Sequence, residues 1–149
     1  MKSTPTVLLV EDSPEDALLF RHALHDCRTE VQLKQVTDGH AALDYLKGEG
    51  AFTDRKVYPL PGLVILDLHI PGFGGLTLLR WIRKQRWLAG LPVVVFSGSD
   101  YGKSVAEAME SGADTYMVKG HECDDLVRLL ENMDLNWARA GEVPQDGSR

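Results

Sequence analysis

Polar side chains suited to chemistry follow four short apolar runs in this sequence of 149 residues. In chain order these side chains are Glu11 and Asp12, Asp67, Ser97, and Lys119. A short apolar run bounded by turn residues is typical of a buried strand. Because ligands of parallel sheets bind at the carboxyl ends of the strands, the pattern predicts that all of these groups meet at one site.

Three carboxylates in one pocket need a partner of opposite charge. Two of them about 4 Å apart repel by about 4 kcal/mol at an effective dielectric constant near 20, so either some are protonated or a cation joins them. Mg²⁺ suits Glu11, Asp12 and Asp67, because it binds carboxylate and carbonyl oxygens and accepts phosphate oxygens. A carboxylate beside that ion can attack phosphorus and form an acyl phosphate, whose oxygens Ser97 and Lys119 would then contact.

Each of these residues also has an ordinary structural explanation. Glu11 and Asp12 would serve as first-turn acids of a helix, Ser97 as a helix N-cap, and Lys119 as a lysine whose head group reaches solvent. The placement of all of them at strand ends favours the chemical interpretation.

The elements that must position these groups alternate along the chain. Apolar runs predict strands at 6–10, 31–36, 63–66, 92–97 and 114–119, and helical spacing predicts helices at 14–27, 39–48, 76–87, 105–112 and 124–137. Pro71 and the glycines that follow it mark a tight turn after Asp67. This alternation predicts an α/β fold, the flavodoxin-like (βα)5 doubly wound parallel sheet with strand order 2-1-3-4-5.

Apolar side chains spaced by three and four residues define the expected buried faces of the helices. They are Ala17, Phe20, Leu24 and Cys27; Ala42, Leu43 and Leu46; Leu78, Leu79 and Ile82; Val105, Ala106 and Met109; and Leu126, Leu129, Leu130, Met133 and Trp137. Between the second helix and the third strand, residues 48–62 form a long connection, either a mobile flap or a tolerated surface insertion.

Composition limits the classes of protein that the chain can represent. Apolar residues make up 44% of it, enough for one domain over 1–140, and the polar segment 141–149 is expected to be disordered. The net charge of −6 argues against nucleic acid or an anionic membrane as the main partner. With only two cysteines and neither a secretory signal nor a long apolar run, we expect a cytoplasmic protein.

The chain over residues 6–137 resembles the receiver domain of the two-component response regulators. The family pattern is an acid pair, an Asp-x-x-x-Pro-x-x-x-Gly loop, a hydroxyl residue and a lysine. Here it is present as Glu11-Asp12, Asp67…Pro71…Gly75, Ser97 and Lys119.

The resemblance implies that Asp67 accepts a phosphoryl group from the phosphohistidine of a sensor histidine kinase or a phosphotransfer protein. It also implies that Asp12, Asp67 and the backbone carbonyl of His69 bind Mg²⁺, with Glu11 acting mostly through water. Tyr116 matches the aromatic residue that turns inward when the hydroxyl residue moves toward the phosphoryl group.

Two positions depart from the family pattern. Gly120 replaces the usual proline after the lysine, and His69 replaces a frequent asparagine. The long connection at 48–62 is similar to that of small regulators paired with phytochrome-type kinases. Such relatives often dimerise, so Trp137 is expected either in a subunit contact or in the core.

Two other functions compete with a phosphorylation switch that works by protein contact. An aspartate-nucleophile phosphatase would carry an Asp-x-Asp pattern, whereas Leu68 and His69 follow Asp67. A flavin-binding module would carry a hydroxyl- and glycine-rich phosphate loop after the first strand, whereas residues 11–16 are rich in acids that repel phosphate. Both are disfavoured, and we expect not an enzyme but a phosphoacceptor switch with self-catalysed, Mg²⁺-dependent phosphotransfer and autodephosphorylation.

Overall fold

The apolar runs form one parallel sheet in the computed structural model, which describes residues 4–25, 30–98, 102–119, 128 and 131. The strands are β1 (Thr6–Val10), β2 (Gln32–Val36), β3 (Leu63–Leu66), β4 (Val93–Ser97) and β5 (Thr115–Val118). Their spatial order is β2-β1-β3-β4-β5, and every neighbouring pair is parallel. This confirms the predicted flavodoxin-like architecture.

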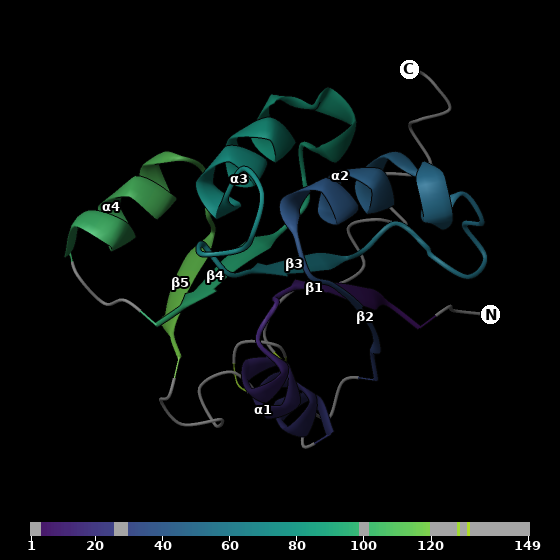
Figure 1. Ribbon diagram of the computed structural model, residues 1–149, viewed down its shortest axis with the longest axis horizontal. Coiled ribbons are helices and arrows are strands. Elements are labelled where there is room, and N and C mark those ends of the chain that lie inside the picture. Colours follow the sequence, from purple (N-terminus) through teal and green to yellow (C-terminus); the bar gives the residue numbers. More distant parts are fainter. Residues whose placement is uncertain (1–3, 26–29, 99–101, 120–127, 129–130, 132–149) are drawn as a thin grey trace.

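Helices cover both faces of the sheet (Figure 1). They are α1 (Pro14–His25), α2 (Gly39–Lys47), α3 (Gly75–Lys84) and α4 (Gly102–Glu110), with short 3-10 turns η1 (Gly50–Phe52) and η2 (Arg86–Leu88). α1 lies on one face, and α2, α3 and α4 lie on the other. Apart from Arg128 and Glu131, the predicted helix at 124–137 lies outside the described residues, as do the tail at 141–149 and Cys27.

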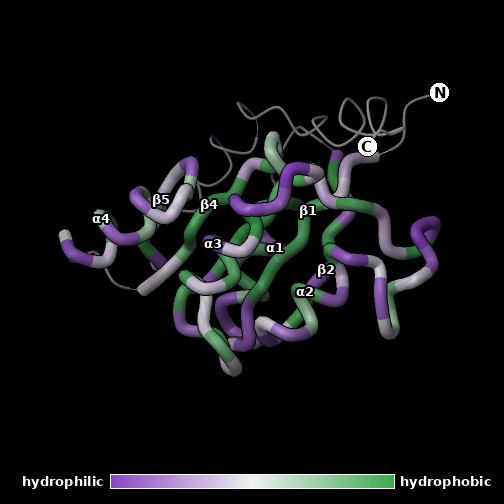
Figure 2. The backbone as a smooth tube through the Cα atoms, turned by 90° about the horizontal axis from the view of Figure 1, so that it is seen from above, coloured by the Kyte–Doolittle hydropathy of each residue, from purple (hydrophilic) through white to green (hydrophobic). Residues whose placement is uncertain are grey.

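Alternate residues of the central strands enter two separate hydrophobic cores. On β3, Val64 and Leu66 face the core under α2 and α3, while Leu63 and Ile65 face the core under α1. All four side chains are fully buried. In Figure 2, the backbone of the central strands is coloured as hydrophobic. Burial on both faces explains why these strands are continuous apolar runs rather than alternating ones.

The register of the strands brings their carboxyl ends to one edge. Val10 pairs with Leu66 on one side and with Val36 on the other, and Ser97 pairs with Val118. The residues that follow Val10, Leu66 and Val118 therefore emerge together, as the sequence predicts.

Two helices differ from their predicted form. α3 ends at Lys84 rather than 87, because Gln85 is extended (φ −90°, ψ 117°) and starts the separate turn η2. In α4 the prediction that Ala106 and Met109 are buried is wrong: Ala106 is exposed, Met109 is 44% exposed, and Ala108 packs into the core. A two-turn helix carries too few apolar residues to fix its phase by spacing alone.

Arg55 fastens the long connection at 48–62 to the end of α2. Its guanidinium donates hydrogen bonds to the carbonyl oxygens of Tyr45 (2.7 Å), Leu46 (2.7 Å) and Tyr58 (3.1 Å). The hydroxyl of Tyr45, a fully buried side chain, donates to the carbonyl oxygen of Pro59 at 2.9 Å. These contacts favour a surface insertion with its own anchors over a mobile flap.

A second arginine ties α3 to the segment before β5, at the edge opposite the polar strand ends. Arg83 donates to the carbonyl oxygens of Gly112 (2.8 Å) and Leu91 (2.7 Å) and to the carboxylate of Asp114 (2.9 Å). Gly112 has φ +111°, and a Cβ there would lie 2.5 Å from the Arg83 side chain. Glycine is therefore required at this position both by conformation and by space.

Candidate functional site

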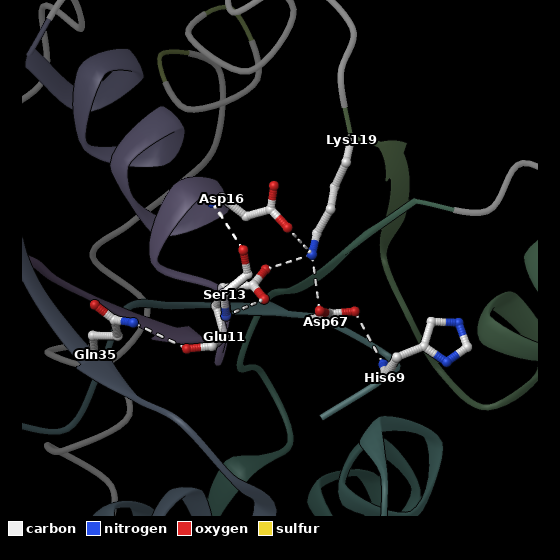
Figure 3. A network of polar contacts seen from close by, with 7 residues as sticks. All are labelled: Glu11, Ser13, Asp16, Gln35, Asp67, His69 and Lys119. Atoms are coloured by element: carbon white, nitrogen blue, oxygen red, sulfur yellow. Dashed lines mark hydrogen bonds and ion pairs between the residues drawn. The ribbon is translucent and has the colours of Figure 1, made fainter. Parts of the chain in front are cut away.

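Lys119 is the centre of an acidic cluster at the carboxyl edge of the sheet (Figure 3). Its Nζ lies 2.7 Å from Glu11 Oε1, 2.8 Å from Asp16 Oδ2 and 2.8 Å from Asp67 Oδ2. The four residues come from the ends of β1, β3 and β5 and from the first turn of α1. The structure thus brings together Glu11, Asp67 and Lys119, as the sequence predicts.

Asp67 directly follows β3 and is 5% exposed. Its Oδ2 accepts a hydrogen bond from Lys119, and its Oδ1 accepts one from the backbone amide of His69 at 3.0 Å. Burial alone would raise the pKa of the Asp67 carboxyl group, but the hydrogen bonds from Lys119 and His69 outweigh it and hold the pKa below its usual value. Asp67 is therefore ionised at neutral pH, as a nucleophilic carboxylate must be.

Glu11 is almost completely buried, at 1% exposed. Its Oε2 accepts a hydrogen bond from the amide of Ser13 at 3.1 Å, whereas Oε1, although 2.7 Å from Lys119 Nζ, has no aligned hydrogen-bond donor. Burial raises the pKa of Glu11 to about 7, against the opposing effect of Lys119. Glu11 thus brings a buried oxygen whose bonding capacity is incompletely used.

Lys119 follows β5, and its side chain is 13% exposed. Burial on its own would lower the pKa of the ammonium group, but hydrogen bonds to Asp16 and Asp67 and the nearby carboxylate of Glu11 outweigh it and raise the pKa above the usual range. The lysine therefore carries a permanent positive charge at the acidic edge.

The acids at this edge are suited to a divalent cation. Glu11, Asp12 and Asp67 each offer a carboxylate oxygen, and these oxygens lie within 4.8 Å of one another. Glu11 and Asp67 are buried, while Asp12 is exposed and leaves a route from solvent. A hard cation prefers such an oxygen set and would also satisfy the poorly bonded Oε1 of Glu11. The donor set fits the predicted Mg²⁺.

Ser97 and Tyr116 occupy the neighbouring strands at this end of the sheet. Ser97 is fully buried at the end of β4, and its carbonyl oxygen accepts a hydrogen bond from the amide of Lys119 at 2.7 Å. Tyr116 is half-buried in β5 and packs against the core on the α2–α4 face. The side chain of His69 is exposed beside Asp67.

Sequence reasoning missed Asp16 as a member of the cluster. Its carboxylate contacts Lys119, which lies 103 residues later in the chain. In the sequence Asp16 is one of the acids in the first turn of a helix, where the helix dipole alone would account for it. No local pattern announces that such an acid faces a distant lysine.

Comparison with known proteins identifies the family to which this arrangement belongs. The sequence profile of the response regulator receiver domain matches residues 7–131. This chain belongs to the response regulator receiver domains. The chain is thus a phosphoacceptor domain, and its cluster of Glu11, Asp12 and Asp67 is one that could bind a metal.

Individual relatives share most of the receiver domain's length. Response regulator Rcp1 of Synechocystis sp. is 29% identical over 138 residues, which are 93% of this chain and 92% of Rcp1. The crystal structure of response regulator RPA3017 in red light signalling of R. palustris is 33% identical, with a TM-score of 0.77 over 85% of this chain and 89% of that one. The Mn²⁺-bound form of Rcp1 is 28% identical, with a TM-score of 0.75 over 88% and 98%.

No helix among the described residues of the receiver domain is long and apolar enough to cross a bilayer.

Proposed function

We propose that this receiver domain accepts a phosphoryl group on Asp67 and relays the signal by protein–protein contact. The donor is the phosphohistidine of a sensor histidine kinase or of a phosphotransfer protein. One observation carries the proposal: the ionised, nearly buried Asp67 belongs to a group of three acids that could hold a metal and also contacts the ammonium group of Lys119.

The transfer requires a nucleophile and positive charge around the phosphoryl oxygens. A carboxylate oxygen of Asp67 forms a bond to phosphorus while the bond from phosphorus to the histidine nitrogen breaks, so the electron pair returns to the imidazole. Lys119 donates hydrogen bonds to a phosphoryl oxygen, and the hydroxyl of Ser97 is proposed to contact another. Tyr116 is proposed to turn inward after Ser97 moves.

Asp12, Asp67 and the carbonyl oxygen of His69 would hold Mg²⁺, with Glu11 bonded through water. When bound, the ion supplies positive charge that offsets the acids and the incoming phosphoryl group, which carries about −1.5 to −2 charges near pH 7. The support for this assignment is the set of three carboxylate oxygens within 4.8 Å of one another.

The kinase partner is proposed to be of the phytochrome type. Its support is the similarity to RPA3017, a response regulator in red light signalling, and to Rcp1 over nearly the full length of each chain. The proposed relay operates in the cytoplasm. A homodimer is also proposed, although Trp137, the residue expected at the subunit contact, lies outside the described residues.

Phosphorylation by a small phosphodonor tests the central assignment. Wild type incubated with acetyl phosphate and Mg²⁺ should gain the mass of one phosphoryl group, which intact-mass spectrometry detects. Asp67→Asn, which keeps the shape of the side chain but removes the nucleophile, should gain none. Equal labelling of wild type and Asp67→Asn would place the acceptor elsewhere, and no labelling of wild type would refute the proposed function.

A further inference from the structure

Asp16 shares the ammonium group of Lys119 with the proposed phosphoacceptor. Its Oδ2 and Oδ2 of Asp67 both lie 2.8 Å from Lys119 Nζ, from opposite sides (Figure 3). We propose that Asp16 is a positioning residue for phosphoryl transfer, whose carboxylate anchors the Lys119 ammonium beside Asp67 before and after the phosphoryl group arrives. This inference rests on the proposed role of Asp67 as acceptor.

The position of Asp16 is fixed by the cap of α1. Ser13 Oγ accepts a hydrogen bond from the amide of Asp16 at 3.2 Å, and the amide of Ser13 donates to Glu11 Oε2 at 3.1 Å. Pro14 begins the helix with a backbone angle that suits its first turn. The carboxylate that reaches Lys119 is therefore held by the same short segment that carries the acid pair after β1.

An ammonium group has three N–H donors, and here they face three acids. Asp16 and Asp67 accept from Lys119 with hydrogen-bond geometry, whereas Glu11 Oε1 is close without being aligned. Formation of an acyl phosphate removes the negative charge of the Asp67 carboxylate, so Lys119 must transfer that contact to a phosphoryl oxygen. Asp16 is not itself phosphorylated, so its hydrogen bond holds the ammonium within reach during the exchange.

Asp16 acts on the lysine rather than on the proposed metal. Among the described residues, the acids whose oxygens lie within 4.8 Å of one another are Glu11, Asp12 and Asp67. Asp16 lies across the Lys119 nitrogen from Asp67 (Figure 3). Its removal should therefore alter the lysine while leaving the affinity for Mg²⁺ nearly unchanged.

The anchoring can be measured without phosphorylation. Acetylation of Lys119 by an amine-reactive ester, followed over time by peptide mass spectrometry, should be several-fold faster in Asp16→Ala than in wild type. Glu15→Gln is the matched control, because it removes an exposed acid from the same helical turn. Equal reactivity of Lys119 in wild type and Asp16→Ala, with both proteins folded by circular dichroism, would overturn the anchoring.

The effect on transfer is measured with acetyl phosphate at saturating Mg²⁺. The labelling rate of Asp16→Ala should fall about tenfold, equivalent to about 1.4 kcal/mol. Asp16→Asn, which still accepts a hydrogen bond but lacks the charge, should lose less, and Asp16→Glu should recover part of the rate. Glu15→Gln should match wild type.

Two further results distinguish positioning from a general structural role. In a Lys119→Gln background, Asp16→Ala should cause no additional loss of rate, because its effect passes through the lysine. Calorimetric titration should give Mg²⁺ dissociation constants within about twofold for wild type and Asp16→Ala, as expected for groups that do not share the ion.

A wild-type labelling rate in Asp16→Ala, or a loss that excess Mg²⁺ restores, would overturn the positioning role. Failure of wild type to become labelled would refute the function of Asp67 instead, and the acetylation of Lys119 would still decide whether Asp16 anchors it.

Discussion

Lys119 Nζ lies 2.8 Å from Asp67 Oδ2, although the two residues are 52 positions apart and follow different strands. The acid of this receiver domain is therefore neutralised in part before any phosphoryl group or metal arrives. Any ligand that approaches Asp67 competes with the ammonium group or shares it. On the proposed function, the lysine should assist a phosphoryl group at Asp67 and oppose a cation bound beside it.

This dual effect predicts that neutralising Lys119 lowers the rate of phosphoryl transfer and raises the affinity for Mg²⁺. Lys119→Met should lower the rate of labelling by acetyl phosphate about 100-fold, since one fixed donor to developing charge is lost. The same substitution should tighten Mg²⁺ binding, because a positive charge that repels the ion is removed. Parallel labelling and calorimetric titration check both directions. Weaker Mg²⁺ binding in the folded variant would contradict this account of the site.

The acid cluster should determine affinity for divalent ions. Asp12→Asn should weaken Mg²⁺ binding at least about tenfold, because a charged ligand to a hard cation is replaced by a neutral one. Chelation of the ion should stop labelling of wild type by acetyl phosphate. Calorimetric titration measures the affinity, and Glu15→Gln controls for the loss of one negative charge near the site. Equal affinities in wild type and Asp12→Asn would exclude Asp12 as a ligand.

Gly75 should tolerate no side chain. A Cβ there would lie 2.6 Å from the carbonyl oxygen of Asp67 and 2.6 Å from Leu68 Cα, so backbone would have to move. Gly75→Ala should lower the free energy of unfolding by about 1–3 kcal/mol. Gly102→Ala is the matched control, since a Cβ at Gly102 meets no atom within 4 Å. Urea unfolding compares the two variants, and similar stabilities would show that the contact relaxes easily.

Arg55 should contribute to stability through the carbonyl groups that it binds. Arg55→Ala removes hydrogen bonds to Tyr45, Leu46 and Tyr58, and we expect a loss of about 1–3 kcal/mol in the free energy of unfolding. Lys56→Ala, at the exposed neighbouring position, should cost less than about 0.5 kcal/mol. Chemical denaturation monitored by circular dichroism gives both values. Equal stabilities of the two variants would mean that the connection at 48–62 contributes little to the fold.

The buried Tyr45 should make the protein sensitive to alkali. Burial raises the pKa of its phenol above the usual value near 10, so the folded state favours the protonated form. The resulting stability is complete below the unfolded-state pKa and is lost as the pH rises beyond about 10. Tyr45→Phe should be less stable than wild type at pH 8, having lost the hydrogen bond to Pro59, but should lose less on going to pH 11. Urea unfolding at both pH values tests this, and parallel losses would contradict it.

The sequence predicted the sheet and most of the site because both depend on strand ends. Asp67 and Lys119 each follow a run of apolar residues, and parallel register brings such ends together. Asp16 escaped prediction because its partner Lys119 lies 103 residues later in the chain. Arg55 escaped it because it binds backbone carbonyl groups, which any residue type provides and which leave no sequence signal. The predicted buried face of α4 was wrong because this short helix buries only Ala108. Met109 is larger and more apolar than Ala108, so the sequence favours it for the core, but it is exposed.

Arg83 and Lys119 each connect β5 to the rest of the fold, but their contacts differ in kind. At one edge Arg83 binds two backbone carbonyl groups and Asp114, none of which belongs to the proposed phosphoryl site. At the other edge, Lys119 joins β5 to β3 through contacts that a phosphoryl group would redistribute. We therefore expect β5 to be held more firmly at the Arg83 end than at the Lys119 end. A change of charge at the lysine end should then displace the carboxyl end of β5 more than its amino end.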